Sequence, residues 1–486
     1  MRALVWNGVN DLRVEQVDEP RLLNAHDAIV KVSLTTSCGS DLHLLGGYVP
    51  TMRSGDVLGH EFVGEVVEVG SAVRRHAVGD RVVVNSFIAC GRCWYCRQEQ
   101  YSLCDNGNPN AGIAEGLWGQ SPGGCFGYSH AVGGWAGSHA EYIRVPYADV
   151  GAFTVPESVS DERALFASDA APTGWMGADL GGVGPGSTVA VWGAGGVGQM
   201  AARASLLLGA ERVVVIDRLP ERLAQVRDVI GAETMDYTQV EVLPELRELT
   251  GGRGPDVCIE AVGMEAHRDR PDFGYDMVKQ QLRLQTDRPT AVREAVMAAR
   301  ASLLLGAERV VVIDRLPERL AQVRDVIGAE TMDYTQVEVL PELRELTGGR
   351  GPDVCIEAVG MEAHRDRPDF GYDMVKQQLR LQTDRPTAVR EAVTAARKGG
   401  SVFVLGVFGG VVDKFPLGAL MNKGLTMRGA QMHGQRYTPM LLERMAAGEL
   451  TTEHLATHVM PLDEAPRGYE MFKEKEDGCV RAVFRP

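Results

Sequence analysis

Four cysteines lie within the fifteen residues of the stretch CGRCWYCRQEQYSLC. Their C-x2-C-x2-C-x7-C spacing lets four thiolates surround one tetrahedral Zn²⁺, and the residues are Cys90, Cys93, Cys96 and Cys104. A site closed by four protein ligands leaves no position for a substrate. The expected role is therefore structural, holding a lobe over residues 90–104 that has little core of its own.

Three other interpretations of this cluster are weaker. An iron–sulfur motif would place the fourth cysteine closer and before a proline. A nucleic-acid zinc ribbon does not suit an acidic chain, and four unrelated thiols rarely occur at this density. The other cysteines have no such neighbours, and we expect buried structural residues at Cys125, Cys258, Cys355 and Cys479.

A second group mixes ligand types. Cys38 in TTSCGSDLH, His60 in LGHEF and Asp169 in FASDAAPTGW would form a zinc site with one open position, able to polarise an alcohol or carbonyl oxygen. Each residue alone is weak evidence, because a lone histidine is more often a core or surface residue and Asp169 would also suit a turn cap. Spacing does not show that the three meet.

A glycine-rich turn, GAGGVG, follows the apolar run STVAVW and opens a helical pattern. About twenty positions later Asp217 ends the run VVVID, which completes the dinucleotide-binding fingerprint. The glycines of this turn allow pyrophosphate to approach the helix N-terminus. The four glycines are Gly193, Gly195, Gly196 and Gly198. A carboxylate at Asp217 favours NAD, while adjacent Arg218 leaves NADP open.

The elements after this turn are duplicated. Residues 200–296 match residues 297–393 without a difference, an offset of 97 residues (297 − 200). One long, perfect copy is not a solenoid, and unequal crossing-over and an assembly error would both leave this junction. Without one copy the chain has 389 residues (486 − 97), which suggests two domains.

Only the first copy follows the glycine turn directly, so Asp217 rather than Asp314 is expected to serve the cofactor. Surface loops tolerate long insertions, and the polar stretch MEAHRDRPDFGYDMVKQQLRLQTDRP from Met264 is the favoured exit for the extra block. The extruded copy contains apolar strand material that could compete for the sheet, swap between subunits or aggregate.

Composition excludes several classes of function. The formal charge is −15 and 44% of residues are hydrophobic, which fits a globular protein and argues against a nucleic-acid partner. The start MRALVWNGVNDLRVEQ has no secretory signal, so cytoplasm is the default. Residues 180–202 are uncharged but are broken by glycines and Pro185, so no membrane span is expected.

Together the motifs resemble the zinc-dependent medium-chain alcohol dehydrogenases, most closely their formaldehyde-dehydrogenase-like branch. The likeness spans the chain outside the extra block and rests on CGSDLH, GDVLGHEFVGEVVEVG, GDRVVV, the four-cysteine lobe, SDAAPTGW, GVGPGSTVAVWGAGGVG and PLDEAPRGYEMFKEKEDGCVRAVFRP. Aspartate at position 169, where many relatives have cysteine, is the feature similar to the formaldehyde branch.

The resemblance assigns roles to individual residues. It implies that Cys38, His60 and Asp169 bind the catalytic zinc and that Glu61 assists ligand exchange at the metal. Ser40 and His43 match the proton relay of the family. Outside that context Ser40 would be a turn hydroxyl and His43 a surface imidazole.

The resemblance also implies an α/β architecture with two zinc ions and NAD bound per chain. A GroES-like catalytic domain with a partly open β-barrel (1–155) precedes a doubly wound Rossmann domain that includes the repeat (156–430). A C-terminal segment (431–486) returns to the catalytic side. Residues 398–406, KGGSVFVLG, should form a turn and a buried strand ending near the nicotinamide, and the protein should be a homodimer or homotetramer.

The predicted activity is hydride transfer between NAD and a primary alcohol or formaldehyde, either free or as its glutathione adduct. The alternative is a catalytically impaired zinc-binding protein, in which the duplicated segment blocks cofactor binding or drives assembly. Bound NAD would distinguish the two, whereas retained zinc would not.

Overall fold

The computed structural model of the chain describes residues 1–47, 49, 51–262, 308–314, 320–321, 323–333, 336–348, 387–408 and 415–486. Two compact units make up the chain, one formed by Met1–Arg268 with Gln382–Pro486 and the other by Asp269–Leu381. The boundaries between the units fall within the polar stretch that the sequence favours as the exit and within its counterpart, and both stretches lie outside the described residues. Cys355 lies outside the described residues.

The catalytic half of the first unit is built on a seven-stranded sheet in the order β10-β6-β5-β3-β20-β19, with β9 also paired to β3. Alternating apolar residues of these strands, such as Val30, Val32, Phe62 and Val84, fill the interior as expected for a partly open barrel. The strands are β3 Ala28–Thr36, β5 Glu61–Val69, β6 Arg81–Val84, β9 Tyr142–Val145, β10 Ala152–Thr154, β19 His458–Pro461 and β20 Ala482–Arg485.

The end of the chain is part of this catalytic sheet. Strand β20 pairs antiparallel with β3, with Val483 opposite Thr36, and parallel with β19. Helix α18 (Ala465–Glu474) buries Tyr469 and Phe472 in a cluster with Leu4 and Leu42 from the start of the chain. The C-terminal segment can therefore supply side chains to a site formed near the N-terminus.

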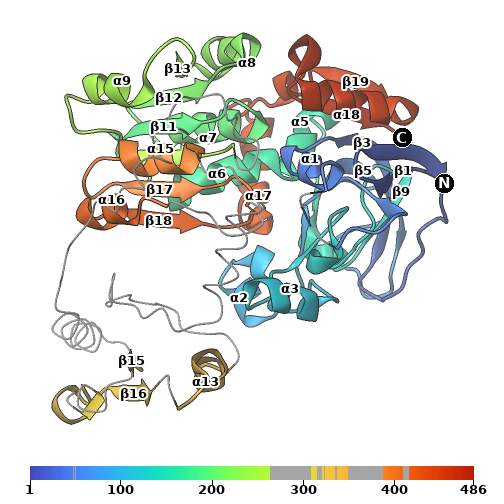
Figure 1. Cartoon of the computed structure of the whole chain (residues 1–486). Helices are drawn as coiled ribbons and strands as arrows, with labels where there is room; N and C mark the ends of the chain where they lie inside the picture. The colour runs from blue at the N-terminus through green and yellow to red at the C-terminus, as the bar shows by residue number, and fades with distance from the viewer. Residues whose placement is uncertain are drawn as a thin grey trace. The chain divides into compact units, whose positions relative to one another are not determined.

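The other half is a six-stranded parallel sheet in the order β13-β12-β11-β14-β17-β18, drawn in green and orange in Figure 1. In chain order this is 3-2-1-4-5-6, the doubly wound arrangement with its switch point between β11 and β14. The strands are β11 Thr188–Trp192, β12 Arg212–Asp217, β13 Glu233–Asp236, β14 Val257–Glu260, β17 Ser401–Val404 and β18 Thr426–Gly429.

Both faces of this sheet are covered by helices, because β11 sends alternate side chains to opposite sides. Val189 and Val191 join the core that contains residues of α6 (Ala170–Leu180) and α7 (Gly196–Leu207). Ala190 and Trp192 join the core that contains residues of α9 (Val242–Leu249) and α15 (Thr387–Ala395). The α/β fold with two kinds of domain is thus confirmed, whereas the predicted domain bounds at residues 155 and 430 stay predictions.

The sheet and the helices that cover it draw on both copies of the repeat. Strands β12, β13 and β14 come from the first copy, whereas most of α15 comes from the second, and the indole of Trp192 donates a 3.0 Å hydrogen bond to Glu391 of that helix. In the second unit, β15 (Val311–Asp314) pairs parallel with β16 (Glu330–Asp333), and α13 (Val339–Leu346) follows. Asp217 therefore ends a strand of the six-stranded sheet, and Asp314 ends one of a separate pair.

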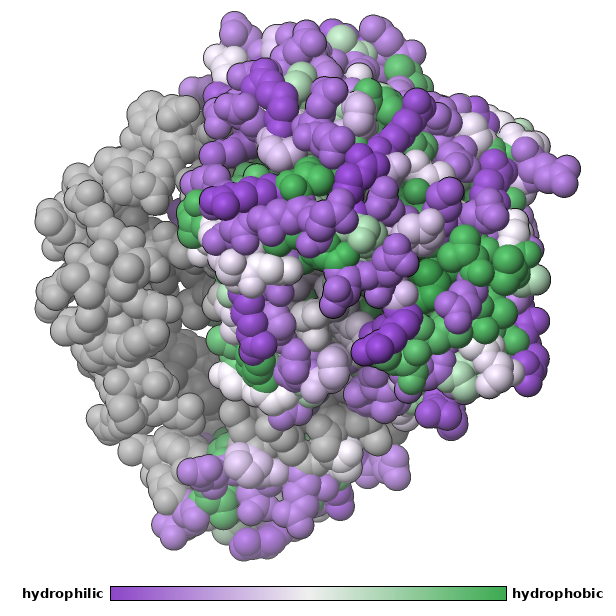
Figure 2. Space-filling model, turned by 90° about the vertical axis from the view of Figure 1, so that its right-hand side faces the viewer, coloured by the Kyte–Doolittle hydropathy of each residue, from purple (hydrophilic) through white to green (hydrophobic). Residues whose placement is uncertain are grey.

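Hydrophilic side chains cover much of the described face shown in Figure 2, with apolar groups gathered in limited patches. Within the described ranges, no helix has the length and apolar character that crossing a lipid bilayer requires. The predicted cytoplasmic location and oligomeric state stay predictions.

Candidate active site

The four cysteines of residues 90–104 converge. Their sulfur atoms all lie within 4.8 Å of one another, and none of the four is in a disulfide. Cys93 precedes the short helix α2 (Trp94–Arg97), Cys96 lies in it, and Cys104 follows the 3-10 turn Tyr101–Leu103. Successive tight turns thus bring distant positions of a short loop to one point.

Amide groups around this cluster are directed at its sulfurs. The backbone N–H groups of Cys90 and Asn106 donate to Cys104 Sγ at 3.2 and 3.4 Å, and the side-chain amide of Asn106 donates to Cys90 Sγ at 3.2 Å. A hydrogen bond from Cys96 lowers the pKa of the Cys104 thiol to about 5. Such donors stabilise thiolates, the form that binds metal, so the donor set fits Zn²⁺.

A second group of possible ligands lies at the start of two barrel elements. Cys38 precedes helix α1 (Gly39–Leu45), His60 immediately precedes strand β5, and Glu61 is the first residue of that strand. One ligand atom from each of the three lies within 4.8 Å of the others, and all three side chains are buried. The structure therefore brings Cys38 and His60 together, as the sequence predicts, with Glu61 beside them.

Asp169 approaches this group from the start of α6. Its Oδ2 lies 4.0 Å from His60 Nε2, accepts a 2.6 Å hydrogen bond from Ser86, and its Oδ1 accepts one of 2.8 Å from Thr173. Asp169 is not among the three residues whose ligand atoms lie within 4.8 Å of one another. Its assignment as the third zinc ligand stays a prediction.

The charges around Cys38 and His60 suit a metal. Burial opposes ionisation of the Cys38 thiol, but Arg481 and His60 outweigh it and lower the pKa of that thiol to about 7. Burial also opposes a charge on His60, yet the Asp41 carboxylate raises its pKa well above the usual value. The site thus stabilises the Cys38 thiolate and a positive charge at His60 beside it. A metal cation bound there would supply the same positive charge next to the thiolate.

The two residues of the predicted proton relay lie in α1. Ser40 Oγ is 3.4 Å from His60 Nε2, so this hydroxyl lies at the predicted ligands. His43 follows three positions later, one helical turn along the same face, and is only 3% exposed. The interpretation of His43 as a surface imidazole is therefore wrong, and the relay itself stays a prediction.

The glycine turn has the close approaches that a dinucleotide site needs. Gly193 follows β11 with φ +100°, and a Cβ at Gly198 would lie 1.8 Å from the Gly193 carbonyl oxygen. A Cβ at Gly195 would meet only Arg222 Nη1, at 3.7 Å. Gly195 precedes α7, so the turn leaves open space at a helix N-terminus, which fits the pyrophosphate of NAD.

Asp217 lies at the end of β12 beside this turn. Its Oδ2 accepts the Ala194 N–H at 2.7 Å, and its Oδ1 accepts the N–H groups of Arg218 and Leu219 at 2.6 and 3.1 Å. A carboxylate offers about four lone-pair positions, so room remains for a ribose hydroxyl. The carboxylate also holds the glycine turn against β12.

Arg481, which the sequence motifs did not single out, connects the two sites. It is 2% exposed, donates to the Ser37 carbonyl and pairs with Glu61 at 3.0 Å. A Cβ at Gly196 would lie 2.8 Å from Arg481 Nε. The available signal was a single arginine inside the apolar run CVRAVF, because a buried cation requires a partner.

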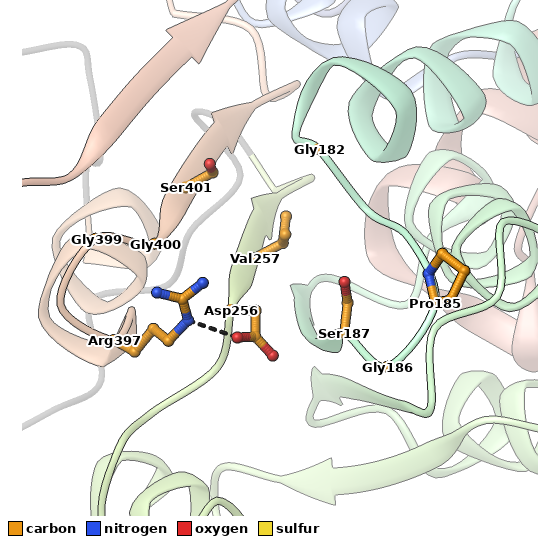
Figure 3. A pocket seen from close by; sticks show the side chains of 10 residues that line it. All are labelled: Gly182, Pro185, Gly186, Ser187, Asp256, Val257, Arg397, Gly399, Gly400 and Ser401. Atoms are coloured by element: carbon orange, nitrogen blue, oxygen red, sulfur yellow. Dashed lines mark hydrogen bonds and ion pairs between the residues drawn. The ribbon is translucent and has the colours of Figure 1, made fainter.

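A polar pocket of about 210 Å³ lies at the N-terminal ends of β11, β14 and β17 (Figure 3). The glycine turn lies at the other end of β11. In Figure 3 the side chains of Arg397 and Asp256, which both line the pocket, point toward each other and form a 2.5 Å ion pair. The second Asp256 oxygen accepts the Thr188 N–H, and the amides of Gly400 and Ser401 are bonded within the chain. These polar groups satisfy one another and leave little for a ligand.

Comparison with known proteins agrees with this geometry. Residues 24–157 match the family described as alcohol dehydrogenase GroES-like domain, and residues 196–270 and 295–367 match the family described as zinc-binding dehydrogenase. A zinc-type alcohol dehydrogenase-like protein of Bacillus subtilis is 30% identical over all of both chains. A glutathione-independent formaldehyde dehydrogenase of Pseudomonas aeruginosa is 38% identical over 54% of this chain and 66% of its own length.

Among solved structures, the alcohol dehydrogenase TADH from Thermus sp. ATN1 matches with a TM-score of 0.67 and 30% identity, covering 100% of this chain and 99% of that one. The chain belongs to the zinc-type medium-chain alcohol dehydrogenase family. It is a zinc-dependent alcohol dehydrogenase-like oxidoreductase.

Proposed function

We propose that this protein oxidises a primary alcohol or formaldehyde, free or as its glutathione adduct, with NAD as the hydride acceptor. The observation that carries this proposal is the position of Arg481, which pairs with Glu61 at the predicted zinc ligands and lies against Gly196 in the glycine turn. The two predicted sites are therefore neighbours, as hydride transfer requires. The partial likeness to formaldehyde dehydrogenases supports the substrate class.

The residues of the site have distinct tasks in this proposal. Cys38, His60 and Asp169 hold the catalytic zinc, and the four-cysteine lobe holds the second ion. When bound, zinc supplies Lewis acidity toward the substrate oxygen, and NAD accepts the hydride. Glu61 assists ligand exchange at the metal. The site therefore holds a second carboxylate beside Asp169, and the ion pair with Arg481 compensates the buried charge of Glu61.

Proton removal is assigned to helix α1. Ser40, whose Oγ lies 3.4 Å from a ring nitrogen of His60 and therefore beside the predicted ligands, accepts the substrate hydroxyl proton while it gives its own hydroxyl proton to His43. His43 is buried, so it does not release the proton directly to solvent. The cofactor ribose is the proposed next carrier of that proton. NAD is held by the glycine turn and Asp217, with Arg218 as the neighbouring cation.

The test is NADH formation by the purified full-length protein with formaldehyde, formaldehyde plus glutathione, and simple primary alcohols. A shortened chain lacking residues 297–393 is measured beside it. Activity of both proteins identifies the substrate class and shows that the duplicated block is tolerated. Activity of the shortened chain alone supports the impaired alternative for the full chain, and inactivity of both with every substrate contradicts the proposed function.

The duplicated aspartates give a second prediction. Asp217→Ala should weaken NAD binding far more than Asp314→Ala, because Asp217 clamps Ala194 of the glycine turn, whereas Asp314 ends a strand of a separate sheet. A loss of about 2 kcal/mol of charge-assisted hydrogen bonding corresponds to roughly 30-fold weaker binding. Titration calorimetry of both variants measures this, and equal losses would contradict the assignment of the cofactor site to the first copy.

A further inference from the structure

Asp41 is a buried carboxylate next to the predicted zinc ligands. Its Oδ1 lies 3.2 Å from His60 Nδ1, and its Oδ2 accepts hydrogen bonds of 2.8 Å from the Cys38 backbone N–H and from the Tyr469 hydroxyl. Two donors fix one oxygen and direct the other at the imidazole. The orientation of the His60 ring therefore depends on Asp41, and that of Asp41 depends in part on Tyr469.

The polar contacts continue beyond Tyr469. Its hydroxyl lies 2.8 Å from His139 Nε2, and His139 Nδ1 lies 2.8 Å from Thr35 Oγ1. Thr35 in turn donates to the Glu61 carbonyl at 2.9 Å. The path thus leaves His60 through Asp41 and returns to the residue after His60 in the chain. The side chains of Asp41, Tyr469, His139 and Thr35 are all at most 1% exposed.

Close packing keeps the rings of this path in place. Tyr469 stacks on Phe484 with centroids 5.9 Å apart, and His139 meets Phe484 edge-on at 5.2 Å. A Cβ at Gly59 would lie 2.4 Å from His139 Nδ1, so glycine at that position makes the approach possible. In such a dry environment each lost hydrogen bond leaves an unsatisfied buried group, so the path has a strong orienting effect.

We infer that Tyr469 and His139 are positioning residues for the catalytic metal site, acting on His60 through Asp41. This inference rests on the proposed function, since it takes Cys38, His60 and Asp169 as the metal ligands. Partners that orient a ligating histidine typically change metal affinity by about 10- to 100-fold when removed. Tyr469 lies in α18, so the C-terminal segment completes the site rather than only covering it.

The test is a titration of the metal-free protein with Co²⁺, whose absorption distinguishes a four-thiolate site from a mixed sulfur, nitrogen and oxygen site. Tyr469→Phe keeps the ring stacked on Phe484 and removes only the hydroxyl. We expect it to weaken Co²⁺ binding at the mixed site by about 10- to 100-fold and to leave the four-cysteine site unchanged. His139→Gln, which retains a polar partner for the tyrosine, should give a smaller loss and serves if Tyr469→Phe does not fold.

A matched control is Tyr437→Phe. The Tyr437 hydroxyl also donates to a carboxylate, that of Asp179, at 2.8 Å, but it lies in α17 (Gly434–Ala446) and does not belong to this path. In an Asp41→Asn background Tyr469→Phe should cause little further loss, because both changes act on one contact. A purely structural role would instead give additive losses.

Several results would overturn the inference, and failure of the proposed site is distinguishable from failure of the positioning role. If the unaltered protein binds Co²⁺ only at the four-cysteine site, the proposed catalytic site fails and the inference fails with it. If the unaltered protein binds two ions and Tyr469→Phe binds both equally well, the positioning role alone is contradicted. Equal losses in Tyr437→Phe and Tyr469→Phe would also contradict it.

Discussion

Cys38→Ala should lower turnover by about 10³-fold while one metal ion per chain remains at the four-cysteine lobe. The substitution removes the single thiolate of the mixed ligand group, whereas the four sulfurs of residues 90–104 form a group of their own. Losing several kcal/mol of Lewis-acid stabilisation corresponds to a factor of this size at 1.36 kcal/mol per tenfold. Steady-state NADH formation and metal analysis of the purified variant give the two readouts.

Cys258→Ala is the matched control for this experiment. Its thiol is also buried, but it lies on β14 in the core of the parallel sheet and belongs to neither ligand group. We expect this control to keep both ions and most of its turnover. Loss of both ions from Cys38→Ala would count against two independent metal sites, and full turnover would count against Cys38 as a ligand.

Gly198→Ala should destabilise the Rossmann half and weaken NAD binding by about 100-fold. The new methyl would lie 1.8 Å from the Gly193 carbonyl oxygen, so the glycine turn must open. Overpacking of this kind costs about 1–3 kcal/mol, and the upper value corresponds to about 100-fold in affinity at 1.4 kcal/mol per tenfold. Thermal unfolding and NAD titration measure the two effects separately.

Gly195→Ala separates cofactor binding from folding. Gly195 has φ −74°, which any residue adopts, and a Cβ there would meet only Arg222 at 3.7 Å. The unfolding temperature should therefore stay close to that of the unaltered protein, while NAD binding falls because the methyl fills the space left for pyrophosphate. NAD binding at the original affinity would contradict the assignment of this turn as the cofactor site.

The sequence predicted those parts of the site in which chemistry and spacing are local. The four cysteines meet because their spacing already fits short turns, and the glycine turn lies between the predicted strand and helix because its steric demands are local. Cys38 and His60 required the family resemblance, because a separation of 22 positions (60 − 38) carries no information about contact. The doubly wound sheet was implied by the family resemblance, and the local pattern by itself predicted only the strand, turn and helix around the glycine turn.

Residues that act over long range were not predicted. Arg481 and Tyr469 come from the last part of the chain and reach the site only because β20 pairs with β3 and α18 packs beside it. Asp41 lies inside the quoted motif CGSDLH, but its role depends on a contact with His60 that spacing does not show. Side chains whose partners lie far away in sequence emerge only when the sheet order is known.

The duplicated block limited the prediction in a different way, because two identical sequences have the same propensity to form each strand and helix. The position of the glycine turn favoured the first copy for Asp217, and β12 indeed lies next to β11 in the sheet. An exit in the polar stretch from Met264 also implies that the helix after that stretch is taken from the second copy, and α15, which covers the same sheet, is taken largely from there. That choice follows from chain connectivity, since α15 leads directly into β17.

The mixed origin of the parallel sheet and its covering helices has a consequence for how the two copies would diverge. Selection that preserves this sheet and its covering helices would act on residues up to 262 of the first copy and on residues 387–393 of the second. The counterpart strands β15 and β16 belong to the separate unit and escape that selection. For a duplication that arose by unequal crossing-over, complete identity of the copies marks a recent event, and the first substitutions should accumulate in those counterpart strands.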